Sequence, residues 1–171
     1  MLRVALTALR AGAVETGGEI APGDPLLADA SWQLAEPARI TGRFSSAGEG
    51  KYYWKVRIET LVRAECRRCL SPVDVPVRVS RGLIFSSGDD APEGDGCYVI
   101  PPRAQVLDLS GAVREELLLA MPQFVECRPD CQGLCPRCGA NLNDGPCGCA
   151  KESDPRWDAL HAALPKRPRT D

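Results

Sequence analysis

Hydrophobic and polar residues alternate along two stretches of the chain between Ile40 and Ser87. The hydrophobic positions on one face are Trp54, Val56 and Ile58 in the first stretch and Val73, Val75, Val77 and Val79 in the second. A period of two is typical of β-strands that bury one face. Pro76 lies inside the second stretch, and because proline has no N–H to donate, we expect this strand at a sheet edge or at a bulge.

The segment between these two strands, "AECRRCLSP", predicts a hairpin tip that carries Cys66 and Cys69. A C-x-x-C pair of the thioredoxin type lies instead between a strand and a helix, at the helix N-terminus. The structural context predicted for Cys66 and Cys69 therefore differs from that of a thioredoxin-type redox motif.

Two segments have the residue spacing of amphipathic helices. In "DLSGAVREELLLAMP", at residues 108–122, Asp108 or Ser110 can cap the start and Pro122 marks the end. The predicted apolar face would cover one face of the sheet and comprises Leu109, Ala112, Val113, Leu117, Ala120 and Met121. A second helix is expected to begin at Asp154 and Pro155, with an apolar stripe of Trp157, Leu160 and Leu164.

The 171-residue chain is 44% hydrophobic and 26% charged, which is ordinary for a protein that buries a core. Its formal net charge of −2 and its pI near 5.5 give no overall attraction to nucleic acid or to anionic membranes. The apolar stretch Val4–Leu9 is short for a signal peptide and is followed by Arg10, and no apolar run has the length of a membrane span. We therefore expect a cytoplasmic, reducing location and no membrane partner.

Six of the nine cysteines lie in "VECRPDCQGLCPRCGANLNDGPCGCA", residues 125–150. An odd number of cysteines and a reducing compartment favour metal binding over disulfides. Zinc takes about four ligands in a tetrahedron, and C-x2–4-C pairs supply two of them from one turn. "CPRCG" predicts such a turn, in which Pro136 fixes φ and Gly139 tolerates a positive φ. The cysteines downstream complete a first zinc site, made of Cys135, Cys138, Cys147 and Cys149.

The simplest pairing of the other cysteines gives a second zinc site, made of Cys66, Cys69, Cys127 and Cys131. A metal ion there would attach the hairpin to the C-terminal segment. An exchange of partners, in which Cys127 joins Cys135 and Cys138, is also compatible with the spacing. Cys97 has no cysteine nearby in the sequence and is interpreted as a spare thiol. The expected cofactor is zinc, as one or two ions.

These elements predict an α+β fold: an antiparallel β-sheet or partial barrel with one packed helix, a cysteine-rich zinc-binding C-terminal segment and a short terminal helix. The expected boundaries are 1–122 for the mainly β domain with its helix, 123–150 for the cysteine-rich segment, and 151–171 for the terminal helix and tail. An edge strand is expected at the N-terminus, with Leu2, Val4 and Leu6 on one face. The chain is expected to return to the sheet at Tyr98–Ile100, after an acidic surface loop at residues 87–96.

The motifs argue against catalysis. Four thiolates close a zinc site, whereas catalytic zinc keeps one position open for water. A zinc deaminase needs H-x-E and P-C-x-x-C, but the proline of "CPRC" follows the first cysteine. The single histidine, His161, lies in the predicted terminal helix, and the sequence has no phosphate- or dinucleotide-binding glycine loop. We therefore expect a non-enzymatic protein without a small-molecule substrate.

The combination of motifs resembles the YceD family of bacterial and plastid proteins. The resemblance runs from about Ile40 to Leu164 and rests on "CRRCL", "REELLLAMP", "CRPDCQGLCPRCGANLN", "CGC" and "DPRWDAL". It implies a non-enzymatic cytoplasmic factor that supports the synthesis, processing or stability of 23S ribosomal RNA. The implied partners are ribosomal RNA, a large-subunit ribosomal protein or an assembly factor. The family's cysteines correspond to the eight residues assigned to the two sites, and Cys97 falls outside the family's pattern.

An acidic protein is a poor general RNA binder, so any contact with ribosomal RNA should be local. The candidate contact residues for RNA or a partner lie beside the predicted metal ligands and are Arg67, Arg68, Arg128 and Arg137. An alternative function uses the same cysteines as a thiol- or zinc-based redox sensor, or as a protein-interaction module. Closed four-thiolate sites favour the first function, whereas an exposed thiol of low pKa would favour the sensor.

Overall fold

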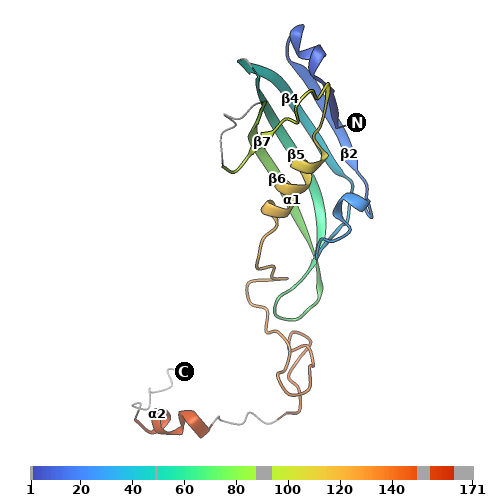
Figure 1. The fold of residues 1–171 in the computed structure, drawn as a ribbon. Coiled ribbons are helices and arrows are strands. Elements are labelled where there is room, and N and C mark those ends of the chain that lie inside the picture. Colours follow the sequence, from blue (N-terminus) through green and yellow to red (C-terminus); the bar gives the residue numbers. More distant parts are fainter. Residues whose placement is uncertain (1, 49, 88–93, 150–154, 164–171) are drawn as a thin grey trace.

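The computed structural model describes residues 2–48, 50–87, 94–149 and 155–163 (Figure 1). Its strands are β1 (Arg3–Ala5), β2 (Val14–Ile20), β3 (Gln33–Leu34), β4 (Ala38–Gly48), β5 (Lys51–Glu65), β6 (Pro72–Ser86), β7 (Cys97–Val99) and β8 (Val106–Asp108). Its α-helices are α1 (Ser110–Ala120) and α2 (Asp158–Ala163), and its 3-10 helices are η1 (Leu6–Arg10), η2 (Pro25–Leu27) and η3 (Pro155–Trp157). The described part of the chain is therefore a mixed α+β fold.

Six of the described strands form one sheet, in the order β2-β4-β5-β6-β7, with β3 also paired to β5. The pairs are antiparallel except for β6 and β7, which run parallel, and β1 and β8 form a separate two-stranded sheet. No pairing among the described strands joins β2 to β7. The sheet is therefore open, and the partial barrel allowed by the sequence pattern is not observed.

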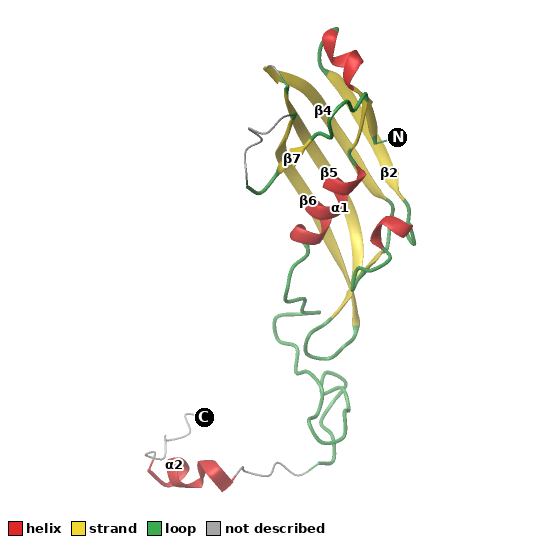
Figure 2. Ribbon diagram, in the orientation of Figure 1, coloured by secondary structure: helices red, strands yellow, loops and turns green. Residues whose placement is uncertain are grey.

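Helix α1 covers one face of the sheet, as the sequence predicts (Figures 1 and 2). The predicted alternation along β5 is confirmed, because Trp54, Val56 and Ile58 are all buried on this face. Val113 and Leu117 of α1 are buried in the same core. Full burial of a side chain of this size stabilises a fold by roughly 1.5–3 kcal/mol, so this layer carries most of the apolar stabilisation.

The β5–β6 hairpin is long, and its far end extends past α1 (Figure 1). Val77 and Val79 are buried, whereas Val73 and Val75, nearer the tip, are only half-buried because no helix covers them. Strand β7 pairs with β6 only at Ile84–Ser86. Among the described strands, Pro76 therefore has β5 as its one neighbour, which confirms the edge position predicted for it.

Three local predictions need correction. The N-terminal strand ends at Ala5 and pairs with β8, because the chain turns into η1 at Leu6. The chain does return to the sheet after the acidic loop, but at Cys97–Val99 and parallel to β6. In α1, Ala120 is exposed, whereas Glu116 is buried and pairs with Arg81 of β6 at 3.3 Å.

The terminal helix is present as η3 and α2, and Trp157 and Leu160 are about half exposed. The predicted cap Asp154, the stripe residue Leu164 and the side chain of His161 lie outside the described residues, as do residues 88–93 of the acidic loop. None of the described helices is long and apolar enough to cross a membrane.

Candidate metal centres

The β5–β6 hairpin ends in a tight turn that carries two cysteines. The Cys66 N–H donates to the Ser71 carbonyl at 2.9 Å, and the Leu70 N–H donates to the Cys66 carbonyl at 2.9 Å. Leu70 has a φ of 58°, the left-handed conformation that closes the turn. The turn places the side chains of Cys66 and Cys69 on the same side of the tip, and both are buried.

The segment after α1 passes along this tip and bonds to it through the backbone. The Arg67 N–H donates to the Val125 carbonyl at 2.8 Å, and the Leu134 N–H donates to the Arg68 carbonyl at 3.1 Å. These two hydrogen bonds bracket Cys127 and Cys131 and hold both residues beside the hairpin.

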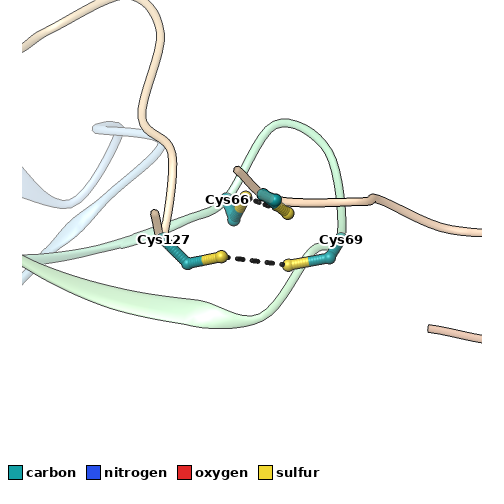
Figure 3. Close-up of side chains that lie close together, drawn as sticks. Cys66, Cys69 and Cys127 are labelled. Carbon is teal, nitrogen blue, oxygen red and sulfur yellow. Dashed lines mark hydrogen bonds between the residues drawn. The ribbon is translucent and has the colours of Figure 1, made fainter. Parts of the chain in front are cut away.

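Four sulfur atoms meet at this junction. The Sγ atoms of Cys69 and Cys127 are 3.6 Å apart, and those of Cys66 and Cys131 are 3.8 Å apart (Figure 3). All four Sγ atoms lie within 4.8 Å of one another. We call Cys66, Cys69, Cys127 and Cys131 the hairpin cluster. Its cysteines come from positions about 60 residues apart, so the cluster exists only in the folded chain.

A second turn of the same shape begins at Cys135. The Gly139 N–H donates to the Cys135 carbonyl at 2.9 Å, and Gly139 has a φ of 71°. The Cys135 N–H donates to the Ala140 carbonyl at 2.8 Å, and the Arg137 N–H points at the Cys135 sulfur at 3.5 Å. Again four Sγ atoms lie within 4.8 Å of one another, and we call this set the C-terminal cluster: Cys135, Cys138, Cys147 and Cys149.

The structure thus brings eight cysteines into the two groups that the spacing favoured, and each group could hold a metal ion. The exchange of Cys127 into the group of Cys135 and Cys138 is not the arrangement seen. All nine cysteines of the chain are free thiols, and Cys97 lies in β7, outside both clusters. In the clusters, Cys127 and Cys138 are exposed, whereas Cys66, Cys69, Cys131 and Cys135 are buried.

Backbone N–H groups favour a thiolate at one sulfur of each cluster. Burial raises the pKa of Cys66, but the N–H groups of Cys69, Arg68 and Cys127 outweigh this effect and lower it to about 6. The N–H groups of Cys138 and Arg137 lower the pKa of Cys135 to about 6. Such donors are typical of the turns that hold thiolate ligands on a metal.

Another sulfur of each cluster holds its proton more tightly. Hydrogen bonds to the sulfurs of Cys131, Cys69 and Cys66, together with partial desolvation of its own sulfur, raise the pKa of Cys127 to about 12. The thiol of Cys138, together with burial, raises the pKa of Cys149 to about 12. Four sulfurs in such a small volume cannot all be negative without a cation, so the arrangement suits a divalent metal.

Asn143 connects the two clusters, and the sequence motifs do not reveal it. It lies in the loop between Cys138 and Cys147, yet its Nδ2 donates to the Cys131 sulfur of the hairpin cluster at 3.4 Å. Its Oδ1 accepts hydrogen bonds from the Gln132 N–H and from the Arg128 side chain, both at 2.8 Å. The loop of one cluster therefore supports a ligand position of the other.

The candidate contact arginines lie around the clusters and bond to neighbouring parts of the chain. Arg67 donates to Glu126 at 2.8 Å and lies over the Phe124 ring at 5.0 Å. Arg68 donates to the Cys131 carbonyl at 2.7 Å, and Arg128 bonds to Asn143 and pairs with Asp130 at 3.4 Å. Arg137 is exposed beside the C-terminal cluster. At least Arg68 and Arg128 thus help to position the clusters.

The chain is similar to several proteins of bacteria and plants. It is 37% identical over 100 residues to an uncharacterized protein of Mycobacterium tuberculosis, which covers 56% of this chain and 47% of that protein. An uncharacterized protein of Mycobacterium leprae is 30% identical over 117 residues, which covers 63% of this chain and 52% of the relative. The chain therefore spans about half the length of these relatives.

A plant relative carries a functional name. The chain is 30% identical over 94 residues to the chloroplastic "Large ribosomal RNA subunit accumulation protein YCED homolog 1" of Arabidopsis thaliana, over 47% of this chain and 29% of that protein. No solved structure gives a significant match. The family described as "Large ribosomal RNA subunit accumulation protein YceD" matches residues 54–163, a range that includes both cysteine clusters and α1. This chain belongs to the YceD family.

Proposed function

We propose that this protein is a non-enzymatic, zinc-stabilised factor that supports the accumulation of 23S ribosomal RNA in the large ribosomal subunit. The observation that carries the proposal is the family match over residues 54–163, which spans the hairpin, α1 and all eight clustered cysteines. The name of the plant relative agrees with it. The proposed partners are ribosomal RNA, a large-subunit ribosomal protein or an assembly factor, and the proposed location is the cytoplasm.

The spacing of the sulfurs and the all-cysteine ligand set support zinc as the proposed metal. A tetrahedron with Zn–S bonds of about 2.3 Å has S–S edges of about 3.8 Å. Two S–S distances in the hairpin cluster are 3.6 and 3.8 Å, close to this edge length. Four thiolates would fill the tetrahedron and leave no position for a reactive water, which supports a structural role rather than a catalytic one.

The proposed ligands are the four cysteines of the C-terminal cluster and the four of the hairpin cluster. Zinc bound there would supply cross-links that join the hairpin tip to residues 127–149. The chain divides on this proposal into a mainly β domain at 1–122, a metal-dependent segment at 123–150 and a terminal helix with its tail at 151–171. The β domain positions the hairpin, and the cysteine-rich segment folds against its tip.

Elemental analysis tests the metal proposal. Protein purified reduced and without chelator should carry about two zinc ions per chain, one for each four-thiolate site. Cys135→Ser and Cys66→Ser should each lose at least one ion, whereas Cys97→Ser, outside both clusters, should keep both. Loss of zinc from Cys97→Ser would contradict the assignment of ligands, and reduced wild-type protein without zinc would contradict the choice of metal.

The cellular test is the ratio of the two large ribosomal RNAs. Cells that lack the protein should have a lower ratio of 23S to small-subunit ribosomal RNA than the parent strain. Their growth should slow most when ribosome demand is high. Wild-type protein and Cys97→Ser should restore the ratio, whereas Cys135→Ser should not. An unchanged ratio in the deletion strain would refute the role in ribosomal RNA accumulation.

The second candidate function is a thiol-based sensor, and the exposure of Cys127 and Cys138 is the observation that favours it. An exposed ligand thiolate can react with an oxidant and release the metal. The two functions predict different responses to mild peroxide. A sensor should release zinc at low peroxide concentration and return to the zinc-bound form after reduction, whereas a structural site should retain its zinc.

A further inference from the structure

The face of the sheet opposite α1 is exposed and rich in cations. Residues directly opposite each other in an antiparallel pair lie on the same face, so the register assigns this face without ambiguity. Its central part joins Arg43 of β4 to Lys55 of β5, with Arg57 two residues further along the same strand. The side chains of all three residues are exposed. Along β5 the cations are spaced by two residues, or about 6.6 Å.

These three cations line a hollow of about 250 Å³, together with the carboxylate of Glu15. The hydroxyl-bearing residues Thr41 and Ser80, which pair in register with Arg57 from either side, also line it. Hydroxyl and guanidinium groups together are the usual donors to a phosphate. Like charges directly opposite each other, as in Arg43 and Lys55, destabilise a sheet, and a bound polyanion would relieve that repulsion.

Two carboxylates lie next to these cations: Glu15 lines the hollow, and Glu59 follows Arg57 by two residues on the same face of β5. Arg43 has a distant partner in Glu15, at 3.9 Å, and Arg63 pairs with Asp74 at 2.9 Å further towards the hairpin tip. Lys55 and Arg57 have no acidic partner within salt-bridge distance among the described residues. Two cations therefore remain available at the centre of an otherwise acidic molecule.

Tyr53 provides an aromatic surface next to the cations. It precedes Lys55 on the same face of β5 and is 41% exposed. Its ring lies across Gly82 of β6: a Cβ added at Gly82 would fall 2.0 Å from the tyrosine Oη and 2.6 Å from Cζ. Because Gly82 has no side chain, the tyrosine ring can lie over the backbone of β6, where it is partly exposed. Ile84, 37% exposed and directly opposite Tyr53, extends this apolar surface.

We propose that this face binds single-stranded RNA, with phosphates at Arg43, Lys55 and Arg57 and a base stacked on Tyr53. A partly exposed aromatic ring beside cations on an exposed sheet is the arrangement by which many sheets bind single strands. The proposal rests on the proposed function, because it assigns the RNA-contacting surface of a factor that acts on ribosomal RNA. It places the contact on the sheet rather than on the arginines around the clusters.

Binding is measured with the purified, zinc-loaded full chain and a fluorescein-labelled single-stranded RNA of about 20 nucleotides, by anisotropy between 50 and 200 mM salt. The double variant Lys55→Glu/Arg57→Glu should raise Kd at least tenfold. It should also reduce the magnitude of the slope of log K against log salt by about 1.4, which corresponds to two lost phosphate contacts. Lys55→Glu faces Arg43, so the variant replaces a repulsion by an attraction and should fold. The matched control Arg103→Glu changes an exposed cation in the loop before β8 and should bind like wild type.

Variants of Tyr53 separate the contribution of base stacking to RNA binding from the contribution of charge. Tyr53→Ala should raise Kd by roughly 5- to 100-fold, because a stacked base is lost. Tyr53→Phe keeps the ring and should bind within about twofold of wild type, since stacking needs the ring and not the hydroxyl. Duplex RNA of the same length, whose bases cannot reach the ring, should bind more weakly and should not respond to Tyr53→Ala.

Three results would overturn the inference: wild-type protein that binds no RNA, sheet variants that bind like wild type, or binding that falls only when Arg67 and Arg68 are changed. The last would move the contact to the hairpin tip. A reduced 23S ratio in the deletion strain together with no RNA binding would leave the proposed function standing through a protein partner. A normal ratio together with tight, Tyr53-dependent binding would contradict the proposed function. It would still support the inference that this face of the sheet binds RNA.

Discussion

Leu70 and Gly139 occupy the same position in the turns of the two cysteine clusters. Each follows the second cysteine of a C-x-x-C pair, and each donates its N–H to the carbonyl of the first cysteine at 2.9 Å. Both have positive φ values, 58° and 71°. A left-handed conformation costs a non-glycine residue about 1–2 kcal/mol, so Leu70 is strained where Gly139 is not. The rest of the hairpin must hold the Leu70 turn in place.

The two positions should respond to substitution in opposite ways. Gly139→Ala should lower the free energy of unfolding of the C-terminal cluster by about 1 kcal/mol, because the added Cβ has open space but the backbone stays left-handed. Leu70→Gly should leave the stability of the hairpin unchanged or raise it slightly, since Leu70 is 56% exposed and its strain is removed. Chelator-competition titration of the zinc-bound variants measures both effects.

The matched control is Gly148→Ala, in the same cluster. A Cβ at Gly148 also meets open space, and its φ is not in the left-handed range. Equal losses at Gly139 and Gly148 would show that the turn conformation is not the cause.

Asn143 is the second residue whose effect can be isolated. Asn143→Asp keeps the acceptor for the Gln132 N–H and loses the donor to the Cys131 sulfur, whereas Asn143→Ala loses both. Loss of a hydrogen bond to a ligand typically lowers metal affinity 10- to 100-fold, so both variants should weaken zinc binding in the hairpin cluster. Titration with cobalt(II), followed by its thiolate absorption, measures the metal affinity of each of the two clusters. A loss confined to the C-terminal cluster would show that Asn143 does not couple them.

At the scale of elements, Asp108 joins three of them. Its Oδ1 accepts from the Ser110 N–H at the start of α1 at 2.9 Å, and its Oδ2 accepts from Arg3 of β1 at 3.0 Å. The hydrogen bonds from Ser110, and then those from Arg3, hold the pKa of Asp108 below its usual value of 3.8. The ionised carboxylate therefore stabilises the junction of β1, β8 and α1.

Removal of the Asp108 carboxylate should lower stability only at pH values at which the carboxylate is ionised. Asp108→Ala should lower the free energy of unfolding by about 1 kcal/mol at pH 7, as the loss of a typical hydrogen bond does. Because the folded pKa is depressed, the contribution is present above the unfolded pKa and is lost as pH falls through the folded pKa. The difference between wild type and variant should therefore shrink below about pH 4 in urea unfolding. The exposed Asp95→Ala serves as control, and a difference that persists at pH 2 would contradict the electrostatic cause.

On the scale of the whole molecule, the β domain and the cysteine-rich segment are stabilised by different means. The core of the β domain contains fully buried side chains such as Trp54, Phe44 and Leu83. In residues 121–149, the described backbone forms turns and one isolated bridge, between Leu134 and Asn141 (Figure 2). The small core around the hairpin cluster consists of three cysteines, with Val73 and Leu134 packed against them. So little apolar burial cannot hold a fold without cross-links.

Metal removal should therefore unfold one part of the molecule and spare the other. After chelation under reducing conditions, the amides of Arg67 and Leu134, which bond across the junction, should lose protection from hydrogen exchange. The amides of β5 at Val56 and Ile58, inside the sheet, should keep it. Hydrogen exchange resolved by residue tests this difference, and equal loss of protection in both parts would mean that the metal stabilises the whole chain.

Local chemistry explains what could be predicted from the sequence alone. The alternation of Trp54, Val56 and Ile58 predicts which face of β5 is buried, because adjacent side chains of a strand point to opposite faces. The helix at 108–122 follows from its spacing and its flanking residues Asp108 and Pro122. The pairing of Cys66 with Cys69 and of Cys135 with Cys138 follows from short C-x-x-C turns, which bring two sulfurs together whatever surrounds them. Each of these features depends on residues that are close in sequence.

The features that the sequence did not reveal depend on residues far apart in the chain. Whether β2 meets β7 depends on long-range pairing and twist, so an open sheet and a partial barrel share one residue pattern. Buried Glu116 is tolerated because Arg81, on a distant strand, lies 3.3 Å away. Asn143 reaches Cys131, and the Tyr53 ring lies over Gly82, only because the backbone brings these pairs together. Sequence periodicity records which face a residue occupies, whereas the partner it meets on that face is decided by tertiary packing.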